Sequence, residues 1–382
     1  MKTRAAVLWG KEQDWKVEEI ELDPPKAGEV LVQMKAAGMC HSDEHAITGD
    51  LSWSDDEGAA MGLAPFFPII GGHEGAGVVV DVGPGVTTLK PGDHVSASFI
   101  PSCGRCRPCS TGKQNLCDLG AAAFVPGQIT DGTHRHHKDG QGLNLFAKLG
   151  TFSEHTVVSE ASVIKVDDDL PFPAVSLVSC GVATGFGSAV KRADTQPGDT
   201  VVVVGCGGVG MNAVQGAKIA GAKHVIAVDP VEFKREKAME FGATHTASSM
   251  AEALPMVNDL TMGQLADRVI MTPGVLYGDL IIEGMALTGK GGTCVATAVA
   301  PMTQVDVKMS LFELTMWQKE LKGAIFGALN PRRDIPELLS MYRAGQLKLD
   351  ELITRTYTLD EINDGYQDMR DNKNIRGMIV FD

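Results

Sequence analysis

The sequence predicts an α/β protein of two domains, a β-rich first part followed by a part built on a parallel sheet. Between about residues 200 and 322, short apolar runs alternate with helical patterns, and right-handed crossovers assemble such a pattern into one parallel sheet. Residues 1–100 instead show short β-rich runs separated by Gly, Pro and Asp, which is typical of an antiparallel barrel or sandwich. A chain of 382 residues also exceeds one typical hydrophobic core, so two domains are expected.

The expected elements follow from local periodicity and from turn residues. Gly-Pro-Gly at 83–85 and Pro-Gly-Asp at 91–93 mark turns between strands of the first part. The last 50 residues no longer alternate strand and helix, so we expect them to return to the first domain. The expected strands are 5–9, 15–22, 30–37, 75–82, 94–99, 201–204, 224–228, 268–271, 293–297 and 377–381, and the expected helical stretches are 173–192, 211–220, 334–344 and 360–369.

A glycine-rich turn lies at the centre of the second part. Four consecutive Val residues, 201–204, predict a strand buried on both faces, and Gly205-Cys-Gly-Gly-Val-Gly210 then leads into a helix. The unpaired N–H groups at the start of that helix and the positive end of its dipole form a pyrophosphate site. Side chains at Gly205, Gly207 and Gly210 would block the close approach of the phosphates. The residues of this turn predicted to bind a dinucleotide are Gly205, Gly207, Gly208, Val209 and Gly210.

The next strand ends in an acid that predicts which dinucleotide binds. Asp229 follows Gly210 by 19 residues, where a carboxylate accepts hydrogen bonds from the adenosine ribose. A carboxylate there repels a 2′-phosphate, so the sequence predicts NAD rather than NADP.

Composition excludes several classes of partner. The formal net charge of −14 disfavours nucleic acid and anionic membranes, and no stretch reaches the ~18 apolar residues of a membrane span. The apolar run at the N-terminus is too short for a signal peptide. The eight cysteines are clustered rather than spread as a disulfide framework, which indicates metal ligation in a reducing compartment. We therefore expect a cytoplasmic protein.

One cysteine cluster has the spacing of a structural zinc site. Cys103, Cys106, Cys109 and Cys117 lie within a 15-residue loop that is rich in Gly, Pro and basic residues. Such short spacings let a loop fold around one tetrahedral Zn²⁺, and a complete set of four thiolates leaves no position open for substrate. The alternative interpretation is two local disulfides or free thiols.

A second set of metal-ligating residues is scattered along the chain. Cys40, His73 and Cys180 together supply two thiolates and one imidazole, which form a three-ligand zinc site with its fourth position open. Spacing alone does not show that these residues meet. Each one taken singly also suits a core or surface position.

These segments, in this order around the four-cysteine loop and the glycine turn, resemble the zinc-dependent medium-chain alcohol dehydrogenases. The resemblance extends over essentially the whole chain, including residues 322–327 and 374–377. It implies a GroES-like β-barrel domain and a Rossmann domain with the active site in the cleft between them. The implied boundaries are 1–181 for the first domain, with a zinc lobe at about 101–118, 182–325 for the Rossmann domain, and 326–382 for a return to the first domain.

The resemblance also implies roles for individual residues. It implies two zinc ions per chain, one structural and one catalytic on Cys40, His73 and Cys180. Glu74 matches the acid behind the catalytic metal, with a member of a buried structural ion pair as the alternative. Asp43 matches the carboxylate that orients the imidazole of His73, with a solvated turn acid as the alternative. Ser42 and His45 match a relay that carries the alcohol proton to solvent through the cofactor ribose; a helix cap or surface position is the alternative for either.

Four further positions match residues that contact NAD(H) in this family. Arg376 matches a basic residue that reaches the pyrophosphate, and His41 stands where the family often has an Arg near it. Thr184 is expected near the nicotinamide and Lys234 beside the adenosine ribose, although an exposed Lys on a helix needs no function.

Two segments depart from the familiar pattern. Residues 53–62 form an acidic insertion between Cys40 and His73, which we expect to overhang the cleft or an interface. The run His134-Arg-His-His137 is expected to be a polar surface loop rather than a metal site. Cys206 and Cys294 receive no role.

The function implied by the resemblance is reversible oxidation of an alcohol to an aldehyde or ketone with NAD. Residues 36–43, 322–327 and 361–368 resemble the bacterial nicotinoprotein subgroup, which keeps NAD(H) bound and regenerates it with an external acceptor such as a nitrosoaniline dye. One alternative is a formaldehyde dehydrogenase that requires glutathione or mycothiol, and another is a non-catalytic dinucleotide-binding redox sensor. Family resemblance also implies a homodimer or homotetramer joined through the Rossmann sheets.

Overall fold

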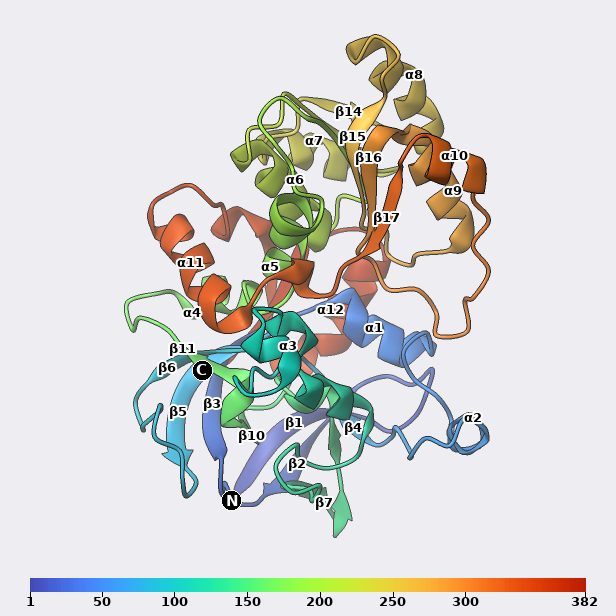
Figure 1. Cartoon of the computed structure of the whole chain (residues 1–382). Helices are drawn as coiled ribbons and strands as arrows, with labels where there is room; N and C mark the ends of the chain where they lie inside the picture. Colours follow the sequence, from blue (N-terminus) through green and yellow to red (C-terminus); the bar gives the residue numbers. More distant parts are fainter. The chain divides into compact units, whose positions relative to one another are not determined.

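The structure is a computed structural model that describes residues 1–121 and 125–382. The chain divides into two compact units, which are described separately below (Figure 1). The first unit comprises Met1–Cys180, Asn330–Arg343 and Leu349–Asp382, and the second comprises Gly181–Leu329 and Ala344–Lys348. No helix in the described part of the chain is long and apolar enough to cross a membrane.

The first unit is built mainly from short strands, with few helices. Its helices are α1 (His41–Thr48), α2 (Asp55–Ala60), α3 (Arg107–Ser110), α4 (Phe172–Leu177), α11 (Pro331–Arg343) and α12 (Ile362–Arg370). Its strands are β1 (Lys2–Leu8), β2 (Lys16–Leu22), β3 (Glu29–Gly38), β4 (Ile69–Ile70), β5 (Ala76–Val82), β6 (His94–Ala97), β7 (His136–Lys138), β8 (Gln141–Gly142), β9 (Asn144–Leu145), β10 (His155–Ser159), β11 (Val163–Lys165), β18 (Ile353–Tyr357) and β19 (Arg376–Val380).

These strands form two mostly antiparallel sheets. One has the order β8-β7-β2-β1-β4-β9, and the other has the order β11-β6-β5-β3-β19-β18 with β10 also paired to β3. The C-terminal strand β19 pairs antiparallel with β3, with Met378 opposite Gly38, so the end of the chain completes this sheet. The predicted β-rich first part is therefore confirmed.

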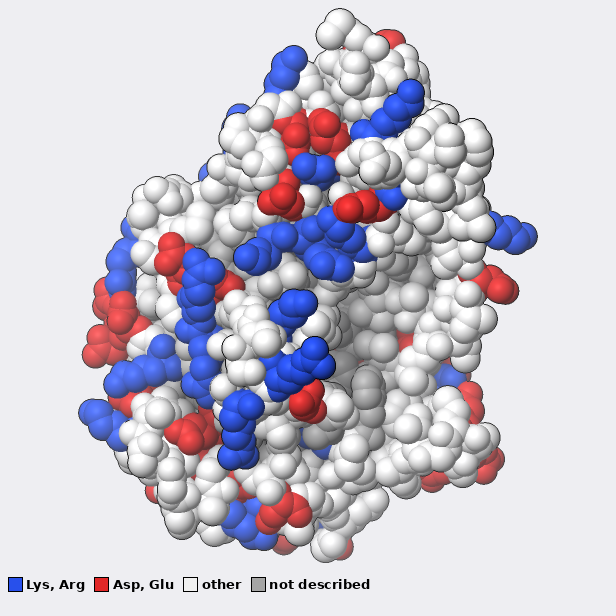
Figure 2. Space-filling view, viewed as in Figure 1, with Lys and Arg blue, Asp and Glu red and all other residues white. Residues whose placement is uncertain are grey.

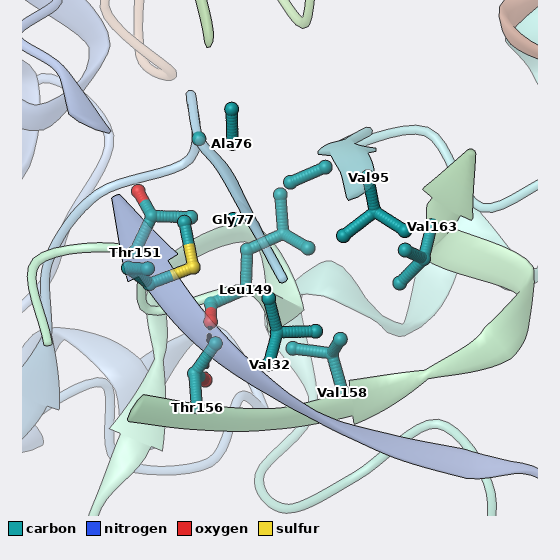
Figure 3. Close-up of a pocket in the computed structure, with 12 residues that line it drawn as sticks. Val32, Ala76, Gly77, Val95, Leu149, Thr151, Thr156, Val158 and Val163 are labelled. Carbon is teal, nitrogen blue, oxygen red and sulfur yellow. Dashed lines mark hydrogen bonds between the residues drawn. The ribbon is translucent and has the colours of Figure 1, made fainter. Parts of the chain in front are cut away.

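The core of the second sheet is aliphatic and contains a small space (Figure 3). Its walls include Val32, Val95 and Val158, each from a different strand. Each of these side chains points to the buried face of the sheet, since successive side chains of a strand point to opposite faces. Two hydroxyls border the space, but Thr156 Oγ1 donates to the Leu149 carbonyl at 2.8 Å and Thr151 Oγ1 donates to the Glu74 carbonyl at 2.9 Å. Because both hydroxyls already donate hydrogen bonds to backbone carbonyls, we interpret the space as a small gap in apolar packing rather than a binding site.

The second unit is a parallel sheet flanked by helices. Its order, β14-β13-β12-β15-β16-β17, is 3-2-1-4-5-6 in chain order, which is the Rossmann arrangement. Every neighbouring pair is parallel, and Figure 1 shows α6 and α7 on one face with α8 and α9 on the other. The elements are β12 (Thr200–Val204), β13 (His224–Val228), β14 (His245–Ala247), β15 (Ala266–Met271), β16 (Thr288–Ala296), β17 (Glu320–Gly323), α5 (Gly181–Gly187), α6 (Gly208–Ile219), α7 (Glu232–Glu240), α8 (Met250–Leu260), α9 (Gly278–Leu287) and α10 (Leu311–Met316).

The predicted α/β class is thus confirmed, with four of the predicted strands at the centre of this sheet. The valines of β12 are buried on both faces, as expected for a central parallel strand. The outer strands β14 and β17 were not predicted. β14 has only three residues, and β17 is an exposed edge strand with the sequence Glu-Leu-Lys-Gly. Neither strand therefore contains the run of apolar residues by which a buried strand is predicted.

Candidate metal centres and cofactor site

The scattered metal-ligating residues meet in the first unit. The ligand atoms of Cys40, His73, Glu74 and Cys180 all lie within 4.8 Å of one another, and all four residues are buried. Cys40 lies between β3 and α1, His73 and Glu74 precede β5, and Cys180 follows α4. Atoms around a tetrahedral zinc are separated by roughly 3.3–3.8 Å, so this cluster has the compactness that a shared ion requires.

A buried carboxylate orients the imidazole of this cluster. Oδ2 of Asp43 lies 3.0 Å from Nδ1 of His73, and Oδ1 of Asp43 accepts the Gly72 N–H at 2.9 Å. Burial opposes a charge on His73, but the neighbouring Asp43 and Cys40 outweigh it and raise the pKa of His73 well above its usual value. Because Nδ1 faces Asp43, Nε2 faces the ligand cluster, and no described residue makes a hydrogen bond with it. An orphaned buried nitrogen of this kind fits a metal ligand.

The two thiols of the cluster differ in their tendency to ionise. A hydrogen bond from Cys180 lowers the pKa of the Cys40 thiol well below its usual value, and the same contact raises the pKa of Cys180. Two cysteine sulfurs, which are both thiolates once a metal binds, and one imidazole form a donor set that zinc prefers, so the residues present fit this ion.

Glu74 forms a buried ion pair behind the cluster. Its Oε2 accepts a short hydrogen bond from the guanidinium of Arg376, which lies at the start of β19. Burial raises the pKa of Glu74 to about 7, although the charge of Arg376 opposes this effect. The sequence predicts Arg376 at the pyrophosphate. In the first unit its guanidinium contacts Glu74, the acid that lies beside Cys40, His73 and Cys180.

The predicted proton-relay residues lie on α1, directly after Cys40. Ser42 Oγ is 3.8 Å from Cys40 Sγ, so this hydroxyl borders the metal cluster. His45 is buried one turn further along, with Nδ1 3.0 Å from Oδ2 of Asp50. His41 is exposed at the first position of the same helix. Sequence reasoning did not select Asp50, because its only signal is the Gly-Asp pair that follows the helix.

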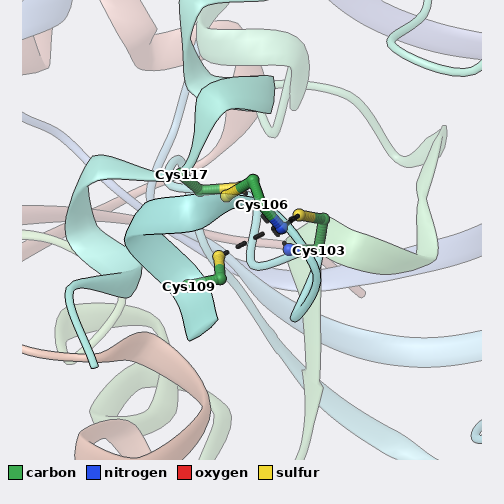
Figure 4. Close-up of side chains that lie close together, drawn as sticks. All are labelled: Cys103, Cys106, Cys109 and Cys117. Carbon is green, nitrogen blue, oxygen red and sulfur yellow. Dashed lines mark hydrogen bonds between the residues drawn. The ribbon is translucent and has the colours of Figure 1, made fainter. Parts of the chain in front are cut away.

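The other four cysteines form a compact cluster of their own (Figure 4). The Sγ atoms of Cys103 and Cys109 are 4.0 Å apart, and those of Cys106 and Cys117 are 3.9 Å apart, close to the spacing around tetrahedral zinc. All four are free thiols rather than disulfides. Burial raises the pKa of the Cys103 thiol, but backbone N–H groups of Arg105 and Cys106 outweigh it and bring the pKa to about 6. The residues therefore fit a closed metal site.

The zinc lobe, residues 101–118, is held against the start of α11 within the first unit. The Gln114 N–H donates to Asn330 Oδ1 at 2.8 Å, and Arg332 Nε donates to the Ser102 carbonyl at 2.9 Å. Figure 2 shows Lys and Arg side chains gathered over this region of the surface. The exposed cations there include Arg105, Arg107, Lys113, Arg332 and Arg333. Their positive charge offsets that of clustered thiolates.

The glycine turn of the second unit has the geometry of a phosphate cradle. Gly205 has φ 91°, which side chains rarely adopt, and α6 begins at Gly208 with Gly207 as its N-cap. A β-carbon at Gly207 would meet no protein atom within 4 Å, so that position borders open space beside the helix N-terminus. Val209 lies in the first turn of the same helix. These features fit a bound pyrophosphate.

Asp229 is fixed at the end of β13 by two backbone donors. Its Oδ2 accepts the Cys206 N–H at 2.8 Å and its Oδ1 accepts the Val231 N–H at 2.9 Å. Lys234 follows on α7, half-buried. Thr184 lies on α5, and its buried Oγ1 has no hydrogen-bond partner among the described residues.

Sequence reasoning missed a threonine that stabilises the glycine turn. Thr272 Oγ1 donates to the carbonyls of Val204 and Gly205 at 3.0 and 2.8 Å. The available signal was its place directly after β15, at the carboxyl edge of the sheet where ligands bind.

One expectation is wrong, because the run His134–His137 is not a polar surface loop. Arg135 is fully buried and its guanidinium makes a bidentate contact with Glu29, at 2.8 and 2.7 Å. His136 is also buried and lies on β7, and burial lowers its pKa to about 3. Within the insertion at 53–62, Trp53 is buried and packs on Phe66 with ring centroids 4.9 Å apart, whereas residues 54–57 are exposed.

Comparison with known proteins agrees with these features. Residues 26–168 match the family model of the alcohol dehydrogenase GroES-like domain, and residues 208–344 match that of the zinc-binding dehydrogenases. The chain is 50% identical over 381 residues to alcohol dehydrogenase B of Mycobacterium tuberculosis and 51% identical over 380 residues to the NDMA-dependent alcohol dehydrogenase of Amycolatopsis methanolica. Each alignment covers 100% of this chain and 99% of the relative.

Solved structures give the same result. The benzyl alcohol dehydrogenase of Acinetobacter calcoaceticus superposes with a TM-score of 0.89 at 27% identity, covering 100% of both chains. A zinc-binding alcohol dehydrogenase domain protein of Burkholderia ambifaria superposes with a TM-score of 0.90, also at 27% identity, covering 100% of this chain and 99% of that one. The chain therefore belongs to the zinc-dependent medium-chain alcohol dehydrogenases, a family of oxidoreductases.

Proposed function

We propose that this protein reversibly oxidises a small alcohol to an aldehyde or ketone with NAD, at a catalytic zinc held by Cys40, His73 and Cys180. The observation that carries the proposal is the meeting of these residues in one buried cluster, with His73 oriented by Asp43. We further propose that a second zinc, held by the four cysteines of the zinc lobe, is structural.

The chain's own residues position the reactants and move one proton. Bound at these sites, zinc supplies a Lewis acid that lowers the pKa of an alcohol hydroxyl, and nicotinamide supplies a hydride acceptor. Ser42, whose Oγ lies 3.8 Å from Cys40 Sγ, accepts the hydroxyl proton. With NAD bound, its ribose hydroxyls would connect Ser42 to His45, and His45 would take up a proton and release it to water. Glu74 and Arg376 form a buried ion pair behind the metal ligands.

Several residues of the chain are proposed to bind NAD. The carboxylate of Asp229, held by two N–H groups, suits a ribose diol and opposes a 2′-phosphate. Gly205, Gly207, Gly208, Val209 and Gly210 receive the pyrophosphate. The remaining proposed contacts are Arg376 and His41 near the pyrophosphate, Thr184 near the nicotinamide and Lys234 beside the adenosine ribose.

We also propose that NAD(H) stays bound between turnovers. The support is the 51% identity to a relative named as an NDMA-dependent alcohol dehydrogenase, which points to an external electron acceptor. The test is the absorbance at about 340 nm of protein purified without added cofactor, with turnover of benzyl alcohol followed in the presence of a nitrosoaniline dye. A reduced-nicotinamide band that disappears on adding the dye is expected.

Other outcomes of that experiment would contradict the proposal in distinct ways. No band and full dependence on added NAD would indicate an ordinary alcohol dehydrogenase. A requirement for glutathione or mycothiol would indicate a thiol-dependent formaldehyde dehydrogenase. Bound cofactor with no turnover of any alcohol would favour a redox sensor.

We propose a homodimer or homotetramer joined through the second unit. The edge strand β17 leaves backbone groups unpaired on one side among the described residues, and its Leu321 is 36% exposed. Near it in sequence, α10 buries none of its residues, and Leu311, Phe312 and Met316 are each more than 60% exposed. Large exposed apolar side chains on one segment favour a protein contact, which light scattering tests directly.

A further inference from the structure

A carboxylate outside the metal cluster contacts the proposed proton acceptor. Oδ2 of Asp50 lies 3.0 Å from Nδ1 of His45, and the side chains are 22% and 4% exposed. Thr48 Oγ1 donates to the same carboxylate oxygen at 2.8 Å. Asp50 thus contacts the ring of His45 at Nδ1.

The end of α1 places Asp50 in this position. Gly49 follows the helix with φ 94°, in the left-handed conformation that terminates many helices. The N–H groups of Gly49 and Leu51 both donate to the His45 carbonyl, at 3.2 and 3.0 Å. The chain therefore turns back over the last helical turn, and the Asp50 side chain reaches the ring of His45.

The charge of Asp50 determines which nitrogen of His45 carries the hydrogen. Burial raises the pKa of the Asp50 carboxyl, but hydrogen bonds from His45 and Thr48 outweigh it and lower this pKa below its usual value. An ionised carboxylate only accepts hydrogen bonds, so Nδ1 of His45 donates. In the neutral ring, Nε2 then carries the lone pair that can accept a proton.

We propose that Asp50 is a positioning residue of the relay: it fixes His45 in the Nδ1–H form, so that Nε2 accepts the proton that leaves the alcohol. This inference rests on the proposed function. With NAD bound, Nε2 of His45 would form an N–H bond to a proton given up by the ribose hydroxyl beside it, and a proton passed on from Ser42 would replace it on that hydroxyl. The ring is positive until Nε2 releases its proton to water, and both the Asp50 carboxylate and the C-terminal end of α1 stabilise that charge.

The competing explanation is that Asp50 only closes the turn after α1. Asp50→Asn distinguishes the two, because an amide can present N–H to Nδ1 and so select the opposite form of the ring. In serine proteases the corresponding change drops kcat by about 10⁴-fold with the geometry intact. Here the transfer is one step of a relay, so we expect a loss of about 10- to 100-fold in kcat for benzyl alcohol, with KM changed by less than about threefold.

A double-mutant cycle with His45→Gln isolates the action through His45. If Asp50 acts through the ring, Asp50→Asn lowers kcat by less than about twofold in the His45→Gln background. The matched control is Asp81→Asn, an exposed acid on β5, which should retain the wild-type rate. Long-range ¹H–¹⁵N spectra of the full-length enzyme, with the His45 signal assigned by its loss in His45→Gln, should show Nδ1–H in the wild type and Nε2–H in Asp50→Asn.

Each contrary result has a distinct meaning. Two results would overturn the positioning role and leave a structural one. One is that His45 keeps Nδ1–H in Asp50→Asn, and the other is that Asp50→Asn lowers kcat equally in the wild-type and His45→Gln backgrounds. A wild-type rate in His45→Gln would instead remove the relay from the proposed function. Failure of the wild-type enzyme to oxidise any alcohol would remove the proposed function itself.

Discussion

Gly210 packs against the carbonyl oxygen of Gly205 so closely that a β-carbon at position 210 would lie 1.8 Å from that oxygen. A β-carbon at Gly207, by contrast, would meet no protein atom within 4 Å. Two glycines of one turn are therefore needed for different reasons. Gly210 is needed for the contact between strand and helix, whereas Gly207 borders the space in which we propose that the cofactor binds.

This difference predicts opposite results for two substitutions. Gly207→Val should leave the thermal transition of the cofactor-free protein within about 2 °C of that of cofactor-free wild type while abolishing NAD binding, because the side chain enters only the space proposed for phosphate. Gly210→Ala should lower both Tm and NAD affinity, because the fold itself must shift. Calorimetry and cofactor titration measure the two effects. Undiminished NAD binding by Gly207→Val would place the pyrophosphate elsewhere.

The contact between Asp43 and His73 predicts a loss of metal affinity. Asp43→Asn removes the charge that orients the imidazole, so zinc affinity at the cluster of Cys40, His73 and Cys180 should fall by about 10- to 100-fold. Competition with a chromophoric chelator measures this affinity. Asp81→Asn, an exposed acid on β5, is the control and should keep wild-type affinity. Equal affinities in the two variants would show that Asp43 does not support the metal.

The zinc lobe should contribute to stability rather than to chemistry. Cys117→Ser opens the four-thiol site, so zinc content should fall by one equivalent per chain and Tm by roughly 10 °C. Cys206→Ser is the control for zinc content, since Cys206 lies in the glycine turn and should leave two equivalents bound. Elemental analysis with calorimetry checks both values. A variant that keeps both zinc ions would contradict the assignment of Cys117.

Buried His136 predicts a specific loss of stability in acid. Burial lowers its pKa from 6.5 to about 3, so between these values the unfolded chain binds a proton that the folded chain does not. Stability must therefore fall as pH drops below 6.5, by up to about 1.4 kcal/mol per unit. Between pH 7 and pH 5, the wild type should lose about 2 kcal/mol more than His136→Gln in urea unfolding.

The neighbouring histidine is the control for this prediction. His137 is partly exposed, with Nε2 3.1 Å from Asp23 Oδ2, so His137→Gln should follow the wild-type loss in acid rather than the His136→Gln curve. If the wild type and His136→Gln show parallel pH dependence, then His136 is already protonated at neutral pH or reaches solvent.

A site could be predicted from the sequence where its residues lie close together along the chain. The four cysteines of the zinc lobe lie within 15 residues and the glycine turn within six, so spacing alone indicated each site. Cys40 and His73 are separated by 32 residues, and His73 and Cys180 by 106, so no spacing rule could bring them together. Their assignment as one set depended on family resemblance, and the structure supplies the geometry.

The misjudged segment at His134–His137 shows the opposite limit. A run of basic residues reads as a solvated surface, but Arg135 is buried because Glu29, 106 residues earlier, accepts two of its hydrogen bonds. Such a pairing is invisible in local composition. The contact between His45 and Asp50 was local, but it depends on a left-handed Gly49 that sequence periodicity does not reveal.

The central claim is that alcohol oxidation occurs at a metal held by Cys40, His73 and Cys180. The most direct test is the turnover of benzyl alcohol by Cys40→Ser, measured on protein whose structural zinc and thermal transition are unchanged. We expect turnover to fall to the background rate while one zinc per chain remains bound. Turnover within about tenfold of the wild type would contradict it, because the reaction would then proceed without the metal ligand on which every other assignment depends.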